Sequence, residues 1–74
     1  MNTKEFKAIR NKLELDREEM AQFLGLSGYM AISNIEIGLR NPNKLAVKLL
    51  RYLNSMTLHN AQKVIEEINK FQTK

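Results

Sequence analysis

The segment from Asp16 to Gly38 constrains the fold of this 74-residue chain most strongly. Asp16 and Glu19 have the spacing of a capping box, which is typical of a helix start. Gly25 follows one helical stretch and suits the positive φ that often ends a helix. Two short helices joined by a tight turn are therefore predicted. Their apolar, inward-facing positions are Met20, Ala21, Phe23, Leu24, Ile32 and Ile35, with Leu26 in the turn.

Residues before and after this segment also have helical patterns. Asn2 and Glu5 have capping-box spacing and predict a helix over about Thr3–Leu13. Asn41 as N-cap and Pro42 as first helical residue predict a helix over about Pro42–Asn54. No stretch has a convincing strand pattern, so the sequence predicts an all-α fold. The apolar stripe of residues 42–54 is expected to contain Leu45, Ala46, Leu49, Leu50 and Leu53.

A fifth helix is predicted over about Leu58–Gln72, with Thr57 as its N-cap. Its apolar residues again form one stripe. This stripe either completes the core of one chain or contacts a second copy across a two-fold axis, and the second reading is favoured. The expected dimer-interface residues are Leu58, Ala61, Val64, Ile65, Ile68 and Phe71.

Composition narrows the possible classes of protein. The length suits one domain, and the absence of cysteine excludes disulfides and cysteine-ligated zinc. No signal-peptide core and no membrane-spanning apolar run are visible, so a cytoplasmic protein without membrane contact is expected. The only histidine, His59, has no second ligand at metal spacing, and no nucleophile–base pair stands out. We therefore expect no enzyme activity, no metal and no cofactor.

The net charge of +4 is unevenly distributed. Residues 1–24 carry equal numbers of basic and acidic side chains. Residues 25–56 carry four basic side chains against the single acidic residue Glu36. A basic excess of this kind suits contact with a polyanion, although a solvated basic surface has the same composition.

The stretches LELDREEMAQFLGLS and ISNIEIGLRNP resemble the helix-turn-helix of phage Cro and cI-type repressors, the XRE group. The resemblance covers about residues 4–54 and implies a lambda-repressor-like bundle with an extra C-terminal helix. It also implies that Ala21 lies where the two helices cross and that Arg10 pairs with Glu36. Four residues separate Ser27 from Ile32 where the simplest family pattern has three, and Gly28 is expected to absorb the extra one.

In this family the second helix of the motif enters the major groove. The outward positions expected to contact bases are Tyr29, Met30, Ser33 and Asn34. Asn34 suits a bidentate contact to adenine, whereas Met30 is equally compatible with a place in the core. Because the helix has no lysine or arginine, an operator rich in A·T pairs is expected.

Phosphate contacts are expected on both sides of the second helix. Arg17 and Gln22 belong to the first helix of the motif, and the N–H groups at its start also suit a phosphate. Ser27 is expected to cap the second helix as well as to approach the backbone. The full set is Arg17, Gln22, Ser27, Arg40, Asn41, Asn43 and Lys44.

The resemblance implies a bacterial or phage transcriptional regulator. Residues 1–56 would form the DNA-binding domain and residues 57–74 a dimerisation helix. The expected partners are double-stranded DNA with a short inverted repeat and a second copy of the chain, and the expected action is repression. The alternative is a protein–protein interaction module, such as an antitoxin or phage accessory protein, whose last helix binds a partner.

Overall fold

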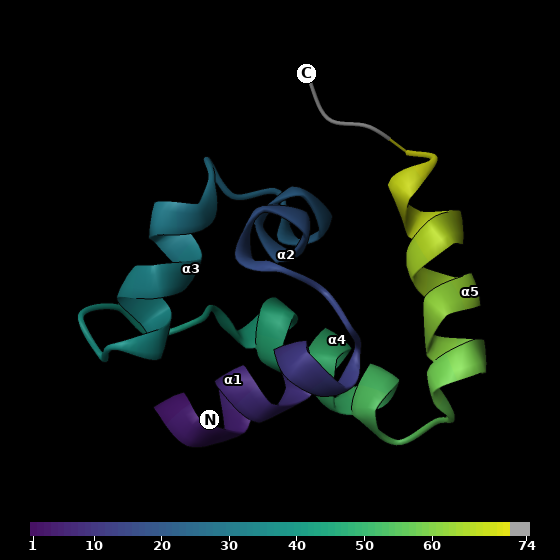
Figure 1. Ribbon diagram of the computed structural model, residues 1–74, viewed down its shortest axis with the longest axis horizontal. Coiled ribbons are helices and arrows are strands. Elements are labelled where there is room, and N and C mark those ends of the chain that lie inside the picture. Colours follow the sequence, from purple (N-terminus) through teal and green to yellow (C-terminus); the bar gives the residue numbers. More distant parts are fainter. Residues whose placement is uncertain (72–74) are drawn as a thin grey trace.

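The structure of this chain is a computed structural model that describes residues 1–71. It contains five helices (Figure 1). The described residues contain no strand, so the all-α prediction is confirmed. The helices are α1 (Thr3–Lys12), α2 (Arg17–Leu24), α3 (Tyr29–Glu36), α4 (Lys44–Asn54) and α5 (Leu58–Asn69). The predicted end of the last helix at Gln72 lies outside the described residues.

Local capping chemistry sets the start of three helices as expected. The side chain of Asn2 accepts a hydrogen bond from the Glu5 N–H at 2.7 Å. Asp16 and Glu19 form both hydrogen bonds of the capping box at the start of α2. The Thr57 hydroxyl accepts from the Asn60 N–H at the start of α5. These residues satisfy N–H groups that the first helical turn leaves without a backbone partner.

The turn between α2 and α3 contains two glycines, of which Gly25 has a backbone conformation that favours glycine. Gly25 ends α2 with φ 71°, the left-handed conformation predicted for it. Gly28 precedes α3 in an extended conformation, and no side chain caps that helix. The prediction that Ser27 caps α3 is therefore wrong. The additional residue moves the helix start to Tyr29, beyond the reach of a Ser27 cap.

The start of α4 differs from the prediction by two residues. Asn43, rather than Asn41, is the N-cap, and its side-chain oxygen accepts from the Ala46 N–H at 2.8 Å. Both asparagines have the chemistry of an N-cap. The chain, however, uses residues 37–43 to cross from the end of α3 to α4 (Figure 1).

Leu45 is 73% exposed, so its predicted place in the buried stripe is wrong. Successive residues of an α-helix are separated by about 100° around its axis. The inward face of α4 contains Ala46, Leu50 and Leu53, which are at most 8% exposed. Leu45 therefore lies beyond the edge of that face, whereas Leu49 is half-buried at its margin.

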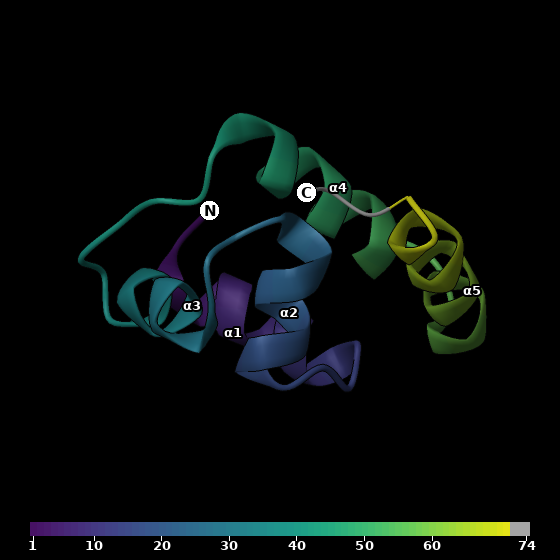
Figure 2. The ribbon, with the colours of Figure 1, turned by 90° about the horizontal axis from the view of Figure 1, so that it is seen from above.

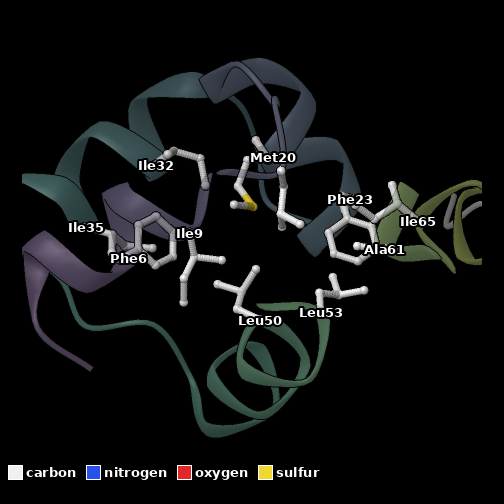
Figure 3. Close-up of a cluster of buried hydrophobic side chains, with 12 residues drawn as sticks. Phe6, Ile9, Met20, Phe23, Ile32, Ile35, Leu50, Leu53, Ala61 and Ile65 are labelled. Carbon is white, nitrogen blue, oxygen red and sulfur yellow. The ribbon is translucent and has the colours of Figure 1, made fainter. Parts of the chain in front are cut away.

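The core joins side chains from every helix (Figure 3). Phe6 and Ile9 of α1 lie near Ile32 and Ile35 of α3, and Met20 of α2 belongs to the same cluster. Ala21, the predicted small residue on α2, is fully buried. The other core residues are Leu13, Phe23, Leu50, Leu53, Ala61 and Ile65.

The last helix belongs to this core. In both ribbon views α5 lies on the far side of α2 from α3 (Figures 1 and 2). Ala61 is fully buried and Ile65 is 6% exposed, and both lie beside Phe23 (Figure 3). These two residues complete the single chain and have no surface for a second copy, which corrects their assignment to a dimer interface.

None of the helices described for residues 1–71 combines the length and the apolar character needed to cross a bilayer.

Candidate nucleic-acid interface

The outer surface of α3 is uncharged. Tyr29 and Met30 are 54% and 56% exposed, so Met30 is not a core residue. Ser33 and Asn34, on the same side of the helix, are half-buried, whereas Ile32 and Ile35 on the opposite side are buried. All four predicted base-contacting residues are therefore at least partly exposed to solvent.

The C-terminal end of α3 is fixed by a buried carboxylate. Glu36, whose side chain is 4% exposed, accepts hydrogen bonds from Arg10 at 2.5 Å and from Arg17 at 3.0 Å. Arg10 also donates to the carbonyl oxygen of Leu15 at 2.9 Å, so its guanidinium joins α1, the start of α2 and α3. The expected pair of Arg10 and Glu36 is present, and Arg17 is a second partner that the sequence did not reveal.

The two arginines determine the protonation state of Glu36. Burial by itself raises the pKa of this carboxyl group. Hydrogen bonds and positive charge from Arg10 and Arg17 outweigh burial and hold the pKa below its ordinary value. The carboxylate is therefore charged at neutral pH and holds α3 against α1 and α2.

The start of α2 is less suited to a phosphate than expected. The Asp16 carboxylate accepts the Glu19 N–H at 2.8 Å, and the Glu19 carboxylate accepts the Asp16 N–H at 2.9 Å. Glu18 adds a further exposed acidic side chain, and the Arg17 guanidinium is shared with Glu36. Arg17 remains 44% exposed, so its contact with a phosphate stays a prediction, one in which the phosphate would share this guanidinium with Glu36.

The segment after α3 is basic and is tied to the helix. The backbone carbonyl of Asn34 accepts hydrogen bonds from the N–H groups of Leu39 and Arg40 at 2.9 and 3.2 Å. The side chains of Arg40, Asn41, Asn43 and Lys44 are all exposed. Asn43 uses its side-chain oxygen to cap α4, so only its amide nitrogen remains for a ligand. Gln22 and Ser27 are exposed on the α2 side of the turn.

Exposed aliphatic side chains surround this basic segment. Ile37 and Leu39 are 69% and 72% exposed, in addition to Leu45 at the start of α4. The exposure of Ile37 and Leu39 was not predicted from the sequence, and Leu45 was predicted to be buried. Ile37 and Leu39 lie on either side of Gly38, directly after the end of α3. Their position next to this glycine was the signal in the sequence that they belong to an exposed turn.

The predicted dimer-interface residues are divided by the structure. Ala61 and Ile65 are in the core, Leu58, Val64 and Ile68 are half-buried, and Phe71 is 83% exposed. Phe71 and Ile68 line an open groove with Phe23 and Leu26 between the ends of α5 and α2. Only this outer part of the stripe remains accessible.

Known proteins do not identify the chain: no protein-family model, curated protein or solved structure matches it. The described part of the chain also contains no cluster of three or more His, Asp or Glu side chains that could hold a metal ion. The described site is therefore an uncharged helix face beside a basic segment, an arrangement able to bind a polyanion.

Proposed function

We propose that this chain is a sequence-specific double-stranded DNA-binding transcriptional regulator, a dimeric repressor in which α2 and α3 form a helix-turn-helix. The observation that carries the proposal is the link between α3 and the basic segment. Hydrogen bonds to the Asn34 carbonyl hold Leu39 and Arg40 at the C-terminal end of α3. A helix inserted into the major groove would thereby bring Arg40 to the adjacent phosphates.

Base recognition is assigned to Tyr29, Met30, Ser33 and Asn34. The Asn34 amide can pair with the N6 and N7 edge of adenine, and Met30 can contact a thymine methyl group. Since α3 has no lysine or arginine for guanine, the preferred operator is rich in A·T pairs.

Backbone contacts are assigned mainly to one side of α3, to Arg40, Asn41, Asn43 and Lys44, with Gln22 and Ser27 adding neutral contacts. Only Arg40 and Lys44 are cationic in this set. Because counterion release follows the number of neutralised phosphates, two such contacts give a log–log salt slope of about −2 per subunit. This is shallower than the slope of a surface in which Arg17 also contacts phosphate.

Dimerisation is assigned to the outer end of α5. Phe71 is 83% exposed, and Ile68 beside it is half-buried, so this end has apolar surface to cover. A two-fold dimer would bind two half-sites whose centres are about 34–36 Å apart.

Selection of binding sites from random duplex DNA tests the function. We expect an A·T-rich inverted repeat, bound in fluorescence anisotropy more tightly than a scrambled duplex. Asn34→Ala should reduce discrimination at one adenine by about 1–3 kcal/mol while binding to scrambled DNA is unchanged. Equal affinity for selected and scrambled duplexes, or G-rich half-sites, would contradict the proposal.

A further inference from the structure

A hollow of about 220 Å³ lies between the α2–α3 turn, α3 and the start of α4. Six of the nine residues that line it are apolar and three are polar, and they come from three separate parts of the chain. This volume is below the roughly 300–1,000 Å³ of pockets that enclose a small molecule. The hollow therefore suits one large apolar side chain rather than a whole ligand. The apolar lining residues are Leu24, Leu26, Ala31, Ile35, Pro42 and Ala46.

Two exposed leucines adjoin residues that line the hollow. Leu39 precedes Arg40 in the chain and is 72% exposed. Leu45 precedes Ala46 and is 73% exposed. Removal of apolar surface from water lowers the free energy. Contact with phosphate oxygens would leave this apolar surface without an apolar partner.

The exposed charged residues that line the hollow, or that follow its lining residues in the chain, are basic. Arg40 lines it, Lys44 follows Asn43 of its rim, and Lys48 is one helical turn further along α4. The sequence has no acidic residue between Glu36 and Glu66 to balance them. An occupant that carries carboxylates would thus be attracted to this surface, whereas a basic one would be repelled.

We propose that this surface, formed by the hollow with Leu39, Leu45, Arg40 and Lys44, binds an acidic segment of a partner protein. One large apolar side chain of the segment fills the hollow, and neighbouring carboxylates pair with Arg40 and Lys44. A central apolar anchor surrounded by polar contacts is the usual arrangement of a protein interface. Because Arg40 and Lys44 are also the proposed phosphate contacts, the partner displaces DNA, a consequence that rests on the proposed function.

Selection from a displayed library of random linear peptides, carried out on the full chain without DNA, tests the docking surface directly. We expect enriched peptides in which aspartate or glutamate flanks a large apolar residue. A synthetic copy of the enriched peptide with lysine in place of each acidic residue should not bind. No enrichment, or enrichment of sequences without acidic residues, would overturn the proposal.

Surface variants then locate the bound peptide. The double substitution Leu39→Ser and Leu45→Ser should weaken the enriched peptide by about tenfold or more, since both leucines would lie at the interface. The control Phe71→Ser removes an equally exposed apolar side chain at the other end of the molecule. It should leave peptide affinity unchanged. Equal effects of the two variants would place the peptide elsewhere and contradict the proposal.

Competition separates this inference from the proposed function. Addition of the enriched peptide should release a fluorescent duplex from the protein in anisotropy. A peptide that binds at Leu39 and Leu45 without any duplex binding would refute the DNA proposal and leave the docking surface intact. Simultaneous binding of peptide and duplex would refute the displacement.

A membrane surface is the other class of ligand that is both acidic and apolar. Sedimentation with phosphatidylserine vesicles tests it. Vesicle binding that depends on Leu39 and Leu45, without peptide binding, would overturn the proposed partner.

Discussion

Two short amphipathic helices, α3 and α5, lie on opposite sides of α2 and are held there by different forces (Figure 2). Each buries a pair of residues almost completely. In α3 these are Ile32 and Ile35, and in α5 they are Ala61 and Ile65, all at most 6% exposed. Apolar burial therefore anchors both helices to the same core.

The difference lies in charge. Glu36 at the end of α3 is held by Arg10 and Arg17, from two other elements. Within residues 1–71, the one ion pair of α5 joins Glu67 to Lys70, the residue just after its end, and both side chains are exposed. An ion pair specifies an angle and a distance, whereas apolar contact can tolerate small shifts. The geometry of α3 is thus specified more closely, as the proposed base contacts require.

Loss of the buried carboxylate should have the largest effect. Glu36→Ala leaves the Arg10 guanidinium buried without its charge partner and should lower the free energy of unfolding by about 3 kcal/mol. Urea denaturation measures this loss. The matched control is Glu5→Ala, which removes the exposed partner of Arg51 and should cost at most about 1 kcal/mol. Similar losses in both variants would show that the Glu36 cluster does not anchor α3.

Loss of apolar packing under α5 should come next. Ile65→Ala creates a cavity beside Phe23 and should lower the free energy of unfolding by about 2 kcal/mol. Lys63→Ala, at an exposed position of the same helix, should change it by less than about 0.5 kcal/mol. The same denaturation curves measure both variants. If Ile65→Ala left stability unchanged, α5 would not belong to the core of the chain.

Removal of positive charge after α3 should weaken DNA binding more than removal of positive charge from α5. Replacing Arg40 and Lys44 with alanine should weaken binding about tenfold and reduce the magnitude of the log–log salt slope by about 2 per subunit. Alanine at Lys63 and Lys70, near α5, removes the same charge and should leave the slope unchanged. Anisotropy titrations at several salt concentrations provide the measurement. A common slope for both variants would mean that DNA does not contact the α3 end specifically.

Acid should lower the free energy of unfolding by protonating Glu36, the carboxylate that holds α3 against α1 and α2. Its pKa is lower in the folded chain than in the unfolded chain, so protonation favours unfolding. The stabilisation is complete above the ordinary glutamate pKa of about 4.3 and is lost as the pH falls through the lower folded value. Denaturation of the original chain and of Glu36→Gln across this range should give unfolding free energies that converge. A constant difference between them would contradict this assignment.

Prediction from the sequence succeeded where the determining contacts are local. Asn2, Asp16 and Thr57 each cap a helix through an N–H group three residues away. Gly25 ends α2 because its missing side chain permits a positive φ. Asn41 and Asn43, however, offered the same local chemistry two residues apart. The crossing from α3 to α4 selected Asn43, which no local pattern indicated.

The sequence by itself determined five helices, the capping residues of three of them and most of the apolar positions that form one core. Only the tertiary structure decided that Arg17 shares Glu36, that Ala61 and Ile65 are covered within one chain, and that Leu39 and Leu45 remain exposed. The physical reason is the range of the interactions. A helix start depends on atoms within one turn, whereas the burial of a side chain and the partner of a charge depend on residues brought together from distant parts of the chain.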